Sequence, residues 1–205
     1  MFQTNKYQAN DPNFDEKHGV LHNKLGIVDP IELEHRENDA LIFAYDHVAS
    51  HYSDTHCFML KDICDLHKLF LGDIFEWAGN YRRVDISSEK IHWCHALHIP
   101  TEMQNYEKRL ARLTPFSLKL SREETLSRLA ELHGELIAIH PFRDGNGRTV
   151  RLLCDLLLMQ AGLAPIGLDA FKEQKTREEY LTAIRAVLNK VDYQPLVHLL
   201  DRLVA

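Results

Sequence analysis

The stretch from His140 to Arg151 constrains the fold of this chain more than any other. It reads HPFRDGNGRTVR, and its Gly-Asn-Gly turn places two residues without side chains around one that tolerates left-handed geometry. Apolar residues at helical spacing follow, from Val150 to Met159, until Gly162 and Pro165 end the pattern. The sequence therefore predicts a sharp turn whose backbone N–H groups lie at the start of a helix.

The residues of this turn favour phosphate chemistry. The first N–H groups of a helix have no partner inside it, and the positive end of the helix dipole lies there, so an anion binds well. Arg148 and Arg151, three residues apart, can flank that anion. Asp144 offers a hard oxygen ligand for Mg²⁺, and His140 is a base near pH 7. The turn is not a Walker A loop, because the sequence contains no GxxxxGK[ST] pattern.

The stretch matches every fixed position of the signature H-P-F-x-[D/E]-G-N-G-R-x-x-R, and in this the chain resembles the Fic family. Members typically transfer AMP from Mg·ATP to a Ser, Thr or Tyr hydroxyl of a target protein. The resemblance implies that His140 is the catalytic base, that Asp144 binds Mg²⁺ and that Phe142 anchors the loop. It also implies that Asn146 and the loop amides hold the α-phosphate, and that the last two arginines hold the departing phosphates. The nucleotide-binding residues it implies are Arg143, Asp144, Gly145, Asn146, Gly147, Arg148 and Arg151.

Three alternatives stay open. The stretch alone could be a glycine turn that caps a helix beside two solvated arginines. Relatives of this loop transfer UMP, phosphocholine or a γ-phosphate, although the phosphorylating branch has Lys in the second half of the turn, where this chain has Gly147. A catalytically silent module that binds nucleotide or a partner is the third alternative. The intact His140, Asp144 and Asn146 argue against it.

The rest of the chain predicts an all-α fold, a helical bundle with a helix–loop–helix active site, and the resemblance implies the Fic fold over one domain, residues 1–205. Residues 1–28 are polar and read as an irregular arm whose Val20, Leu21, Leu25 and Ile27 dock on the body. Capping residues and apolar spacing place the helices. We expect them from Asp29 to about His51, from Lys61 to Trp77, from Thr101 to Pro115, from Ser121 to His140, from Thr176 onward and from Pro195 to Leu203.

Residues 81–93 depart from the helical pattern. Their apolar positions flank a polar Ser-Ser-Glu-Lys turn, which predicts two short strands. An open strand edge can pair with an extended peptide. The Fic family carries its flap here, a hairpin that holds the target segment over the active site, and the alternative is a surface hairpin without a partner. The target-binding residues that the resemblance implies are Ile86, Ser87, Ser88 and Ile91.

The composition excludes several classes of protein. A formal net charge of -6 and an isoelectric point near 6.1 give no basic surface, so we expect no direct contact with nucleic acid. The four cysteines form no CxxC pair, which is typical of reduced thiols in a cytosol. The spacing of His92, His95 and His98 could bind zinc, but no second pair of ligands follows, so we expect no native metal there. No apolar run reaches about 18 residues, and residues 1–11 lack the features of a leader, so we expect a cytoplasmic protein without a membrane segment.

Fic proteins are typically inhibited by a helix that carries [S/T]-x-x-x-E-[G/N]. The chain does not contain this pattern: Ser127 and Glu131 are followed by Leu132, and Glu37 has Leu33 where Ser or Thr is required. The chain therefore resembles the toxin-type class, in which a separate small antitoxin would supply a Glu to Arg151. Similar toxins modify the ATPase subunits of type II topoisomerases, which makes such a subunit a candidate protein target.

Overall fold

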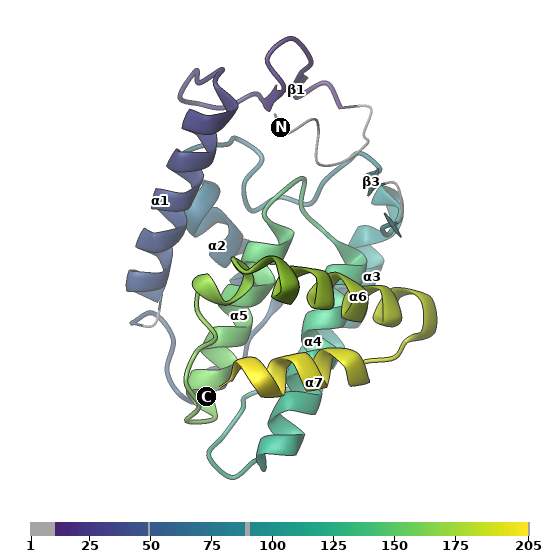
Figure 1. Cartoon of the computed structure of the whole chain (residues 1–205). Coiled ribbons are helices and arrows are strands. Elements are labelled where there is room, and N and C mark those ends of the chain that lie inside the picture. Colours follow the sequence, from purple (N-terminus) through teal and green to yellow (C-terminus); the bar gives the residue numbers. More distant parts are fainter. Residues whose placement is uncertain (1–10, 49, 89–90, 205) are drawn as a thin grey trace.

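The computed structural model describes residues 11–48, 50–88 and 91–204. Over these residues it is a helical bundle with two small antiparallel hairpins, which confirms the expected all-α class with a short hairpin. Figure 1 shows α1 along one side of the molecule, with α6 and α7 crossing α4 and α5. The helices are α1 Pro30–Val48, α2 Leu60–Leu71, α3 Ile99–Leu113, α4 Arg122–Ile139, α5 Asn146–Gln160, α6 Gln174–Lys190 and α7 Gln194–Leu203. The strands are β1 Phe14–Asp15, paired with β2 Val20–Leu21, and β3 Ser87–Ser88, paired with β4 Ile91–His92. Short 3₁₀ turns lie at Ala96–His98 and Asp169–Phe171.

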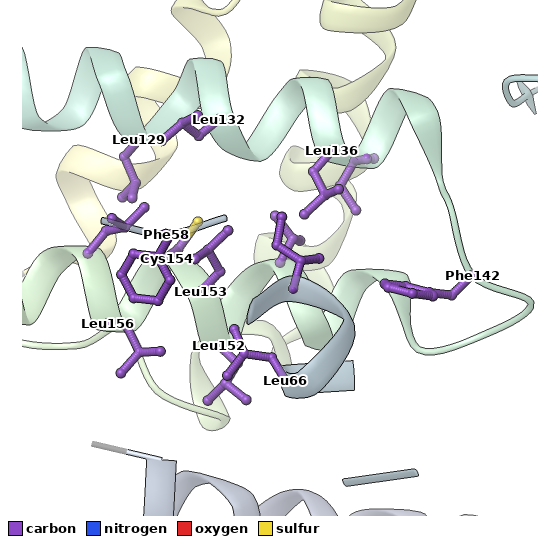
Figure 2. Close-up of a cluster of buried hydrophobic side chains, with 14 of the residues drawn as sticks. Phe58, Leu66, Leu129, Leu132, Leu136, Phe142, Leu152, Leu153, Cys154 and Leu156 are labelled. Atoms are coloured by element: carbon purple, nitrogen blue, oxygen red, sulfur yellow. The ribbon is translucent and has the colours of Figure 1, made fainter. Parts of the chain in front are cut away.

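The core is organised around α4, which packs against α3, α5, α6 and α7. Figure 2 shows the leucines of α4 facing those of α5, and Phe142 lying in the loop that joins the two helices. Each such leucine, when fully buried, stabilises the fold by about 1.5–3 kcal/mol. The loop from His140 to Gly145 is therefore held at both ends by buried helices.

The start of α4 follows the expected capping box. The Ser121 hydroxyl oxygen accepts from the Glu124 N–H at 3.2 Å, and the Glu124 carboxylate accepts from the Ser121 N–H at 3.0 Å. The start of α1 also agrees, because the Asp29 carboxylate accepts from the Ile31 N–H at 2.8 Å. These reciprocal bonds satisfy N–H groups that a helix start leaves without partners.

Three predicted helix boundaries are wrong. Helix α2 ends at Leu71, not at Trp77. Hydrogen-bonded turns follow it and keep Ile74 and Phe75 buried, so the apolar spacing continues after the helix has ended. Helix α6 begins at Gln174, and Thr176 lies inside its first turn rather than capping it. The predicted end of α1 near His51 is three residues late, since α1 ends at Val48, and Ala49 lies outside the described residues.

The arm is more ordered than predicted. Residues 14–21 form the β1–β2 hairpin, and the Val20 side chain of β2 is buried in the core. Leu21 and Ile27 pack against the core as expected, but Leu25 is 44% exposed and does not dock. The part of the predicted arm at residues 1–10 lies outside the described residues. No helix within the described ranges combines the length and the apolar character that crossing a membrane requires.

Candidate active site

The loop between α4 and α5 has the sharp geometry that its glycine turn predicts. His140 caps α4 in the left-handed region, with φ 52°, and Gly145 precedes α5 with φ 79°. Asn146 and Gly147 already belong to the first turn of α5. Of the two glycines, only Gly145 has a positive φ that favours glycine. The N–H groups of the turn therefore lie at a helix N-terminus, as expected.

The Asn146 side chain closes this loop on itself. Its carbonyl oxygen accepts from the Phe142 N–H, and its amide donates to the Phe142 carbonyl, both at 2.8 Å. The side chain is 2% exposed. Asn146 therefore shapes the loop through its side chain, and it offers a ligand its backbone N–H at the start of α5.

His140 lies in this loop as a fixed imidazole. Its Nδ1 is 3.1 Å from the carbonyl oxygen of Ile137, which can only accept, so Nδ1 carries the proton in the neutral ring. The basic lone pair then belongs to Nε2. The Trp93 ring packs against the imidazole, with centroids 4.4 Å apart. The side chain that the sequence assigns as a base is therefore held in the tautomer that a base requires.

Two residues that sequence reasoning missed hold the loop from outside. Arg82 is buried, and its Nε donates to the His140 carbonyl at 2.8 Å. His67 is buried as well; its Nε2 donates to the Asp144 carbonyl at 2.9 Å and its Nδ1 accepts from the Gly79 N–H at 2.8 Å. Burial lowers the pKa of His67 to about 4, so the ring is neutral at pH 7. Phe142 stacks on this ring, with centroids 3.8 Å apart.

The first arginine of the pair is held by acids. Arg148 Nη1 lies 2.5 Å from a carboxylate oxygen of Glu37 on α1, and its Nη2 lies 3.7 Å from a carboxylate oxygen of Asp144. Glu37 does not match the inhibitory pattern, because Leu33 stands four residues earlier where Ser or Thr is required. The structure nevertheless places it on Arg148, although not on Arg151. The two residues are 111 positions apart, so no local pattern could have shown the pair.

The second arginine is held differently. The Arg151 guanidinium lies over the Phe171 ring, 5.2 Å from its centroid. Among the described residues, no carboxylate lies within ion-pair distance of it. Arg151 therefore keeps its positive charge available at the same end of α5 as the turn.

Arg143 takes a position that the sequence did not indicate. Its Nε pairs with the Asp11 carboxylate of the arm, and both side chains are buried. Its Nη2 is buried without a hydrogen-bond partner. As the structure stands, Arg143 ties the arm to the active-site loop.

A pocket of about 330 Å³ opens beside the loop. The β1–β2 hairpin and α1 form one wall, and the loop and the start of α5 form the other. Four arginines line the pocket: Arg143, Arg148, Arg151 and Arg177. Glu34, Glu37 and Asp144 line it as well. Arg177 comes from the first turn of α6 and was not among the predicted site residues. Asp11 and Glu37 pair with two of these arginines, so Arg151 and Arg177 are the guanidinium groups best placed to bind the phosphates of a ligand.

The flap is present as a short hairpin. Ser87 pairs with His92 and Ser88 with Ile91, and all but His92 are partly buried. Ile86 was expected to bind the target, but it is 3% exposed, so in this structure it supports the flap from below and presents no surface to a target. The predicted turn residues Glu89 and Lys90 lie outside the described residues. Within the described ranges, no group of three or more His, Cys, Asp or Glu residues is arranged to hold a metal, and this includes His92, His95 and His98.

Comparisons with known proteins agree with this architecture. A model of the Fic/DOC family matches residues 57–158. The chain is 36% identical over 158 residues to the protein adenylyltransferase VbhT of Bartonella schoenbuchensis, which is 77% of this chain and 33% of VbhT. It is 32% identical over 141 residues to the probable protein adenylyltransferase Fic of Salmonella typhimurium, which is 64% of this chain and 68% of that protein. The matched region is thus only a third of VbhT, and 45% of a relative from Nematostella vectensis.

Solved structures show the same fold. The crystal structure of the BepC protein of Bartonella tribocorum with bound AMPPNP has a TM-score of 0.76 and 23% identity, and covers 94% of this chain and 96% of that one. The Fic domain of a Bartonella quintana effector has a TM-score of 0.77 and 24% identity, and covers 94% and 91%. The loop signature, the matched family model and the shared bundle lead to one conclusion: this chain belongs to the Fic/DOC family and has its fold.

Proposed function

We propose that this chain is a protein adenylyltransferase that moves AMP from Mg·ATP to a Ser, Thr or Tyr hydroxyl of a target protein. The observation that carries the proposal is a fixed base in the α4–α5 loop beside an arginine-lined pocket at the start of α5. The His140 tautomer leaves the lone pair on Nε2, and Arg148 and Arg151 line the pocket at the start of α5. Curated relatives are named protein adenylyltransferases, which supports the same reaction.

In the proposed reaction, Nε2 of His140 takes the proton of the target hydroxyl. The hydroxyl oxygen forms a bond to the α-phosphorus, and the bond from that phosphorus to the pyrophosphate oxygen breaks. The pyrophosphate leaves with the bonding electrons. Arg148, Arg151 and Arg177 would stabilise the negative charge that grows on it, because fixed charges in a partly enclosed site cost no reorganisation. The turn N–H groups of Asn146 and Gly147 would hold the α-phosphate, while the Gly145 N–H donates to the Asp144 carboxylate.

The donor set fits one Mg²⁺ ion. Mg²⁺ is typically held by one or two carboxylates together with substrate phosphates. The Asp144 side chain is 20% exposed at the edge of the arginine-lined pocket, where phosphate oxygens would complete such a set. When bound there, the ion would neutralise phosphate charge during transfer. The BepC structure contains AMPPNP, which supports ATP as the substrate.

The flap is the proposed site of the target. A segment of the target would lie along β3 and β4, near Ser87, Ser88 and Ile91, which Ile86 supports from below, and next to Trp93 and the His140 ring. We propose the ATPase subunit of a type II topoisomerase as the first target to test, and a cytoplasmic location to match it.

We also propose a small antitoxin that supplies a Glu to Arg151. Arg148 already has a carboxylate partner in Glu37, whereas Arg151 has none among the described residues, which supports this assignment. An added Glu would compete with a phosphate for the Arg151 guanidinium. If the wild type keeps full activity with its small partner bound at saturation, this part of the proposal is wrong.

The test of the reaction is intact mass spectrometry. The chain is incubated with Mg·ATP and the topoisomerase subunit, and in parallel with Mg·UTP. We expect a gain of one AMP on a protein, and a loss of about 10²–10⁴-fold in rate for His140→Ala. His198→Ala, on α7, is the matched control and keeps its rate. A gain of UMP or of phosphate, or equal rates for the two variants, would contradict the proposal.

A further inference from the structure

The Arg82 guanidinium connects the two ends of the flap to the loop that carries His140. Its Nη1 donates to the Val84 carbonyl at 2.8 Å, and its Nη2 donates to the carbonyl of Cys94. Val84 lies before strand β3 and Cys94 after strand β4. On its other side, Nε donates to the His140 carbonyl at 2.8 Å, and Nη2 also reaches the Ile139 carbonyl at 3.4 Å.

This arrangement uses what is special to arginine. The guanidinium is planar, keeps its charge and directs its donors in a fixed fork. The residue is 5% exposed, and the four acceptors come from three segments of the chain. A backbone bond continues the connection, since the Arg82 N–H donates to the Pro141 carbonyl at 2.8 Å. A lysine has a single ammonium and cannot span these acceptors in one plane.

The loop residue His140, whose carbonyl Arg82 binds, has a strained backbone conformation. His140 has φ 52°, and for a residue with a side chain the left-handed region is unfavourable. Such a conformation persists only where its surroundings hold it. Arg82 bonds the carbonyl of this residue, and the Trp93 ring at the end of the flap packs on its imidazole. The backbone and the ring of His140 are thus both fixed by elements of the flap.

We propose that Arg82 is a positioning residue that sets the flap and His140 in one geometry, so that a target placed on the flap meets the Nε2 of His140. Arg82 is not among the residues that line the arginine-lined pocket. Its role therefore concerns the alignment of the target with the base and leaves nucleotide binding unchanged. This inference rests on the proposed function for its kinetic consequence, but its structural consequence can be measured alone.

The structural test is hydrogen exchange of the wild-type chain in increasing urea. The Arg82 bonds predict that residues 83–88 and 91–95 open together with residues 139–142, with one common dependence on urea. The variant Arg82→Lys should raise exchange in these segments together while α4 residues near Leu129 keep their protection. Flap exchange that rises without exchange at 139–142, in either experiment, would overturn the proposal. The wild-type measurement decides the matter even if the variant does not fold.

The kinetic test compares Arg82→Lys with Arg122→Lys. Arg122 also donates to backbone carbonyls, of Asp201 and Val204, but at the opposite end of α4. For Arg82→Lys we expect kcat/KM toward the protein target to fall about 10²-fold, the typical effect of a small misplacement, with binding of AMPPNP unchanged. Arg122→Lys should change neither. Parallel loss of AMPPNP binding and transfer, or the same effect in both variants, would overturn the proposal. A wild type without AMP transfer would instead refute the proposed function and leave the exchange result standing.

Discussion

The substitution Gly145→Ala tests the geometry of the loop most sharply. Gly145 has φ 79°, and a Cβ built there would lie 2.8 Å from Cδ1 of Leu71 and 3.1 Å from Nε2 of His67. Both neighbours are fully buried, so neither can move away without disturbing the core. The left-handed backbone costs an alanine about 1–2 kcal/mol, and overpacking a buried site typically costs about 1–3 kcal/mol. Together these predict a loss of roughly 2–5 kcal/mol in the free energy of unfolding.

Two other glycines separate these contributions. Gly26 has φ 66° and open space around it, so Gly26→Ala should lose only the backbone contribution of about 1–2 kcal/mol. Gly147 is helical, and a Cβ there would meet only the end of the Arg151 side chain at 3.2 Å. Gly147→Ala should therefore be neutral or gain up to about 1 kcal/mol. Urea unfolding followed by circular dichroism measures all three. If Gly145→Ala is no less stable than Gly26→Ala, the close packing of the loop on His67 is refuted.

Three further predictions concern the contacts that hold the site. Burial lowers the pKa of His67 from its ordinary value of 6.5 to about 4, so between these pH values the unfolded chain binds this proton and the folded chain does not. Stability should therefore be highest above pH 6.5 and fall toward pH 4 by about 1.4 kcal/mol per pH unit. Urea unfolding of His67→Gln should lack this part of the pH dependence. Asp11→Asn leaves the buried Arg143 charge without its partner and should lower the free energy of unfolding by about 3–5 kcal/mol, so a loss below 1 kcal/mol would contradict the pairing. Glu37→Gln removes the carboxylate that pairs with Arg148, so Arg148 becomes available to a phosphate. Calorimetry should then show AMPPNP binding that is about five- to tenfold tighter. Unchanged or weaker binding would show that Arg148 does not reach the ligand.

The sequence indicated the elements whose signals are local. The capping pair at Ser121 and Glu124 placed the start of α4, and the glycine turn indicated a helix directly after it, although α5 already begins inside the turn at Asn146. The end of α2 was wrong because the turns after Leu71 bury apolar residues at nearly helical spacing. A periodic pattern reports which residues are buried, and it does not distinguish a helix from a series of turns.

The residues that hold the site could not be found in this way. His67 lies 77 positions from Asp144, Arg82 lies 58 from His140, and Asp11 lies 132 from Arg143. Each acts mainly on a backbone group or a buried charge of a distant segment, and such a contact leaves no spacing pattern in the chain. The side chain of Asn146 shows the same limit, because the family resemblance implied a phosphate ligand while its two hydrogen bonds to Phe142 close the loop.

Transfer of AMP by His140 is the central claim, and the fate of the label from ATP tests it most directly. The chain is incubated with Mg·ATP labelled on the α-phosphate, and separately with ATP labelled on the γ-phosphate, and the protein and the released nucleotides are counted. We predict that protein gains the α-label only, that the γ-label is recovered as pyrophosphate, and that His140→Ala loses nearly all transfer. Transfer of the γ-label, or α-label on protein at the same rate with His140→Ala, would contradict the account.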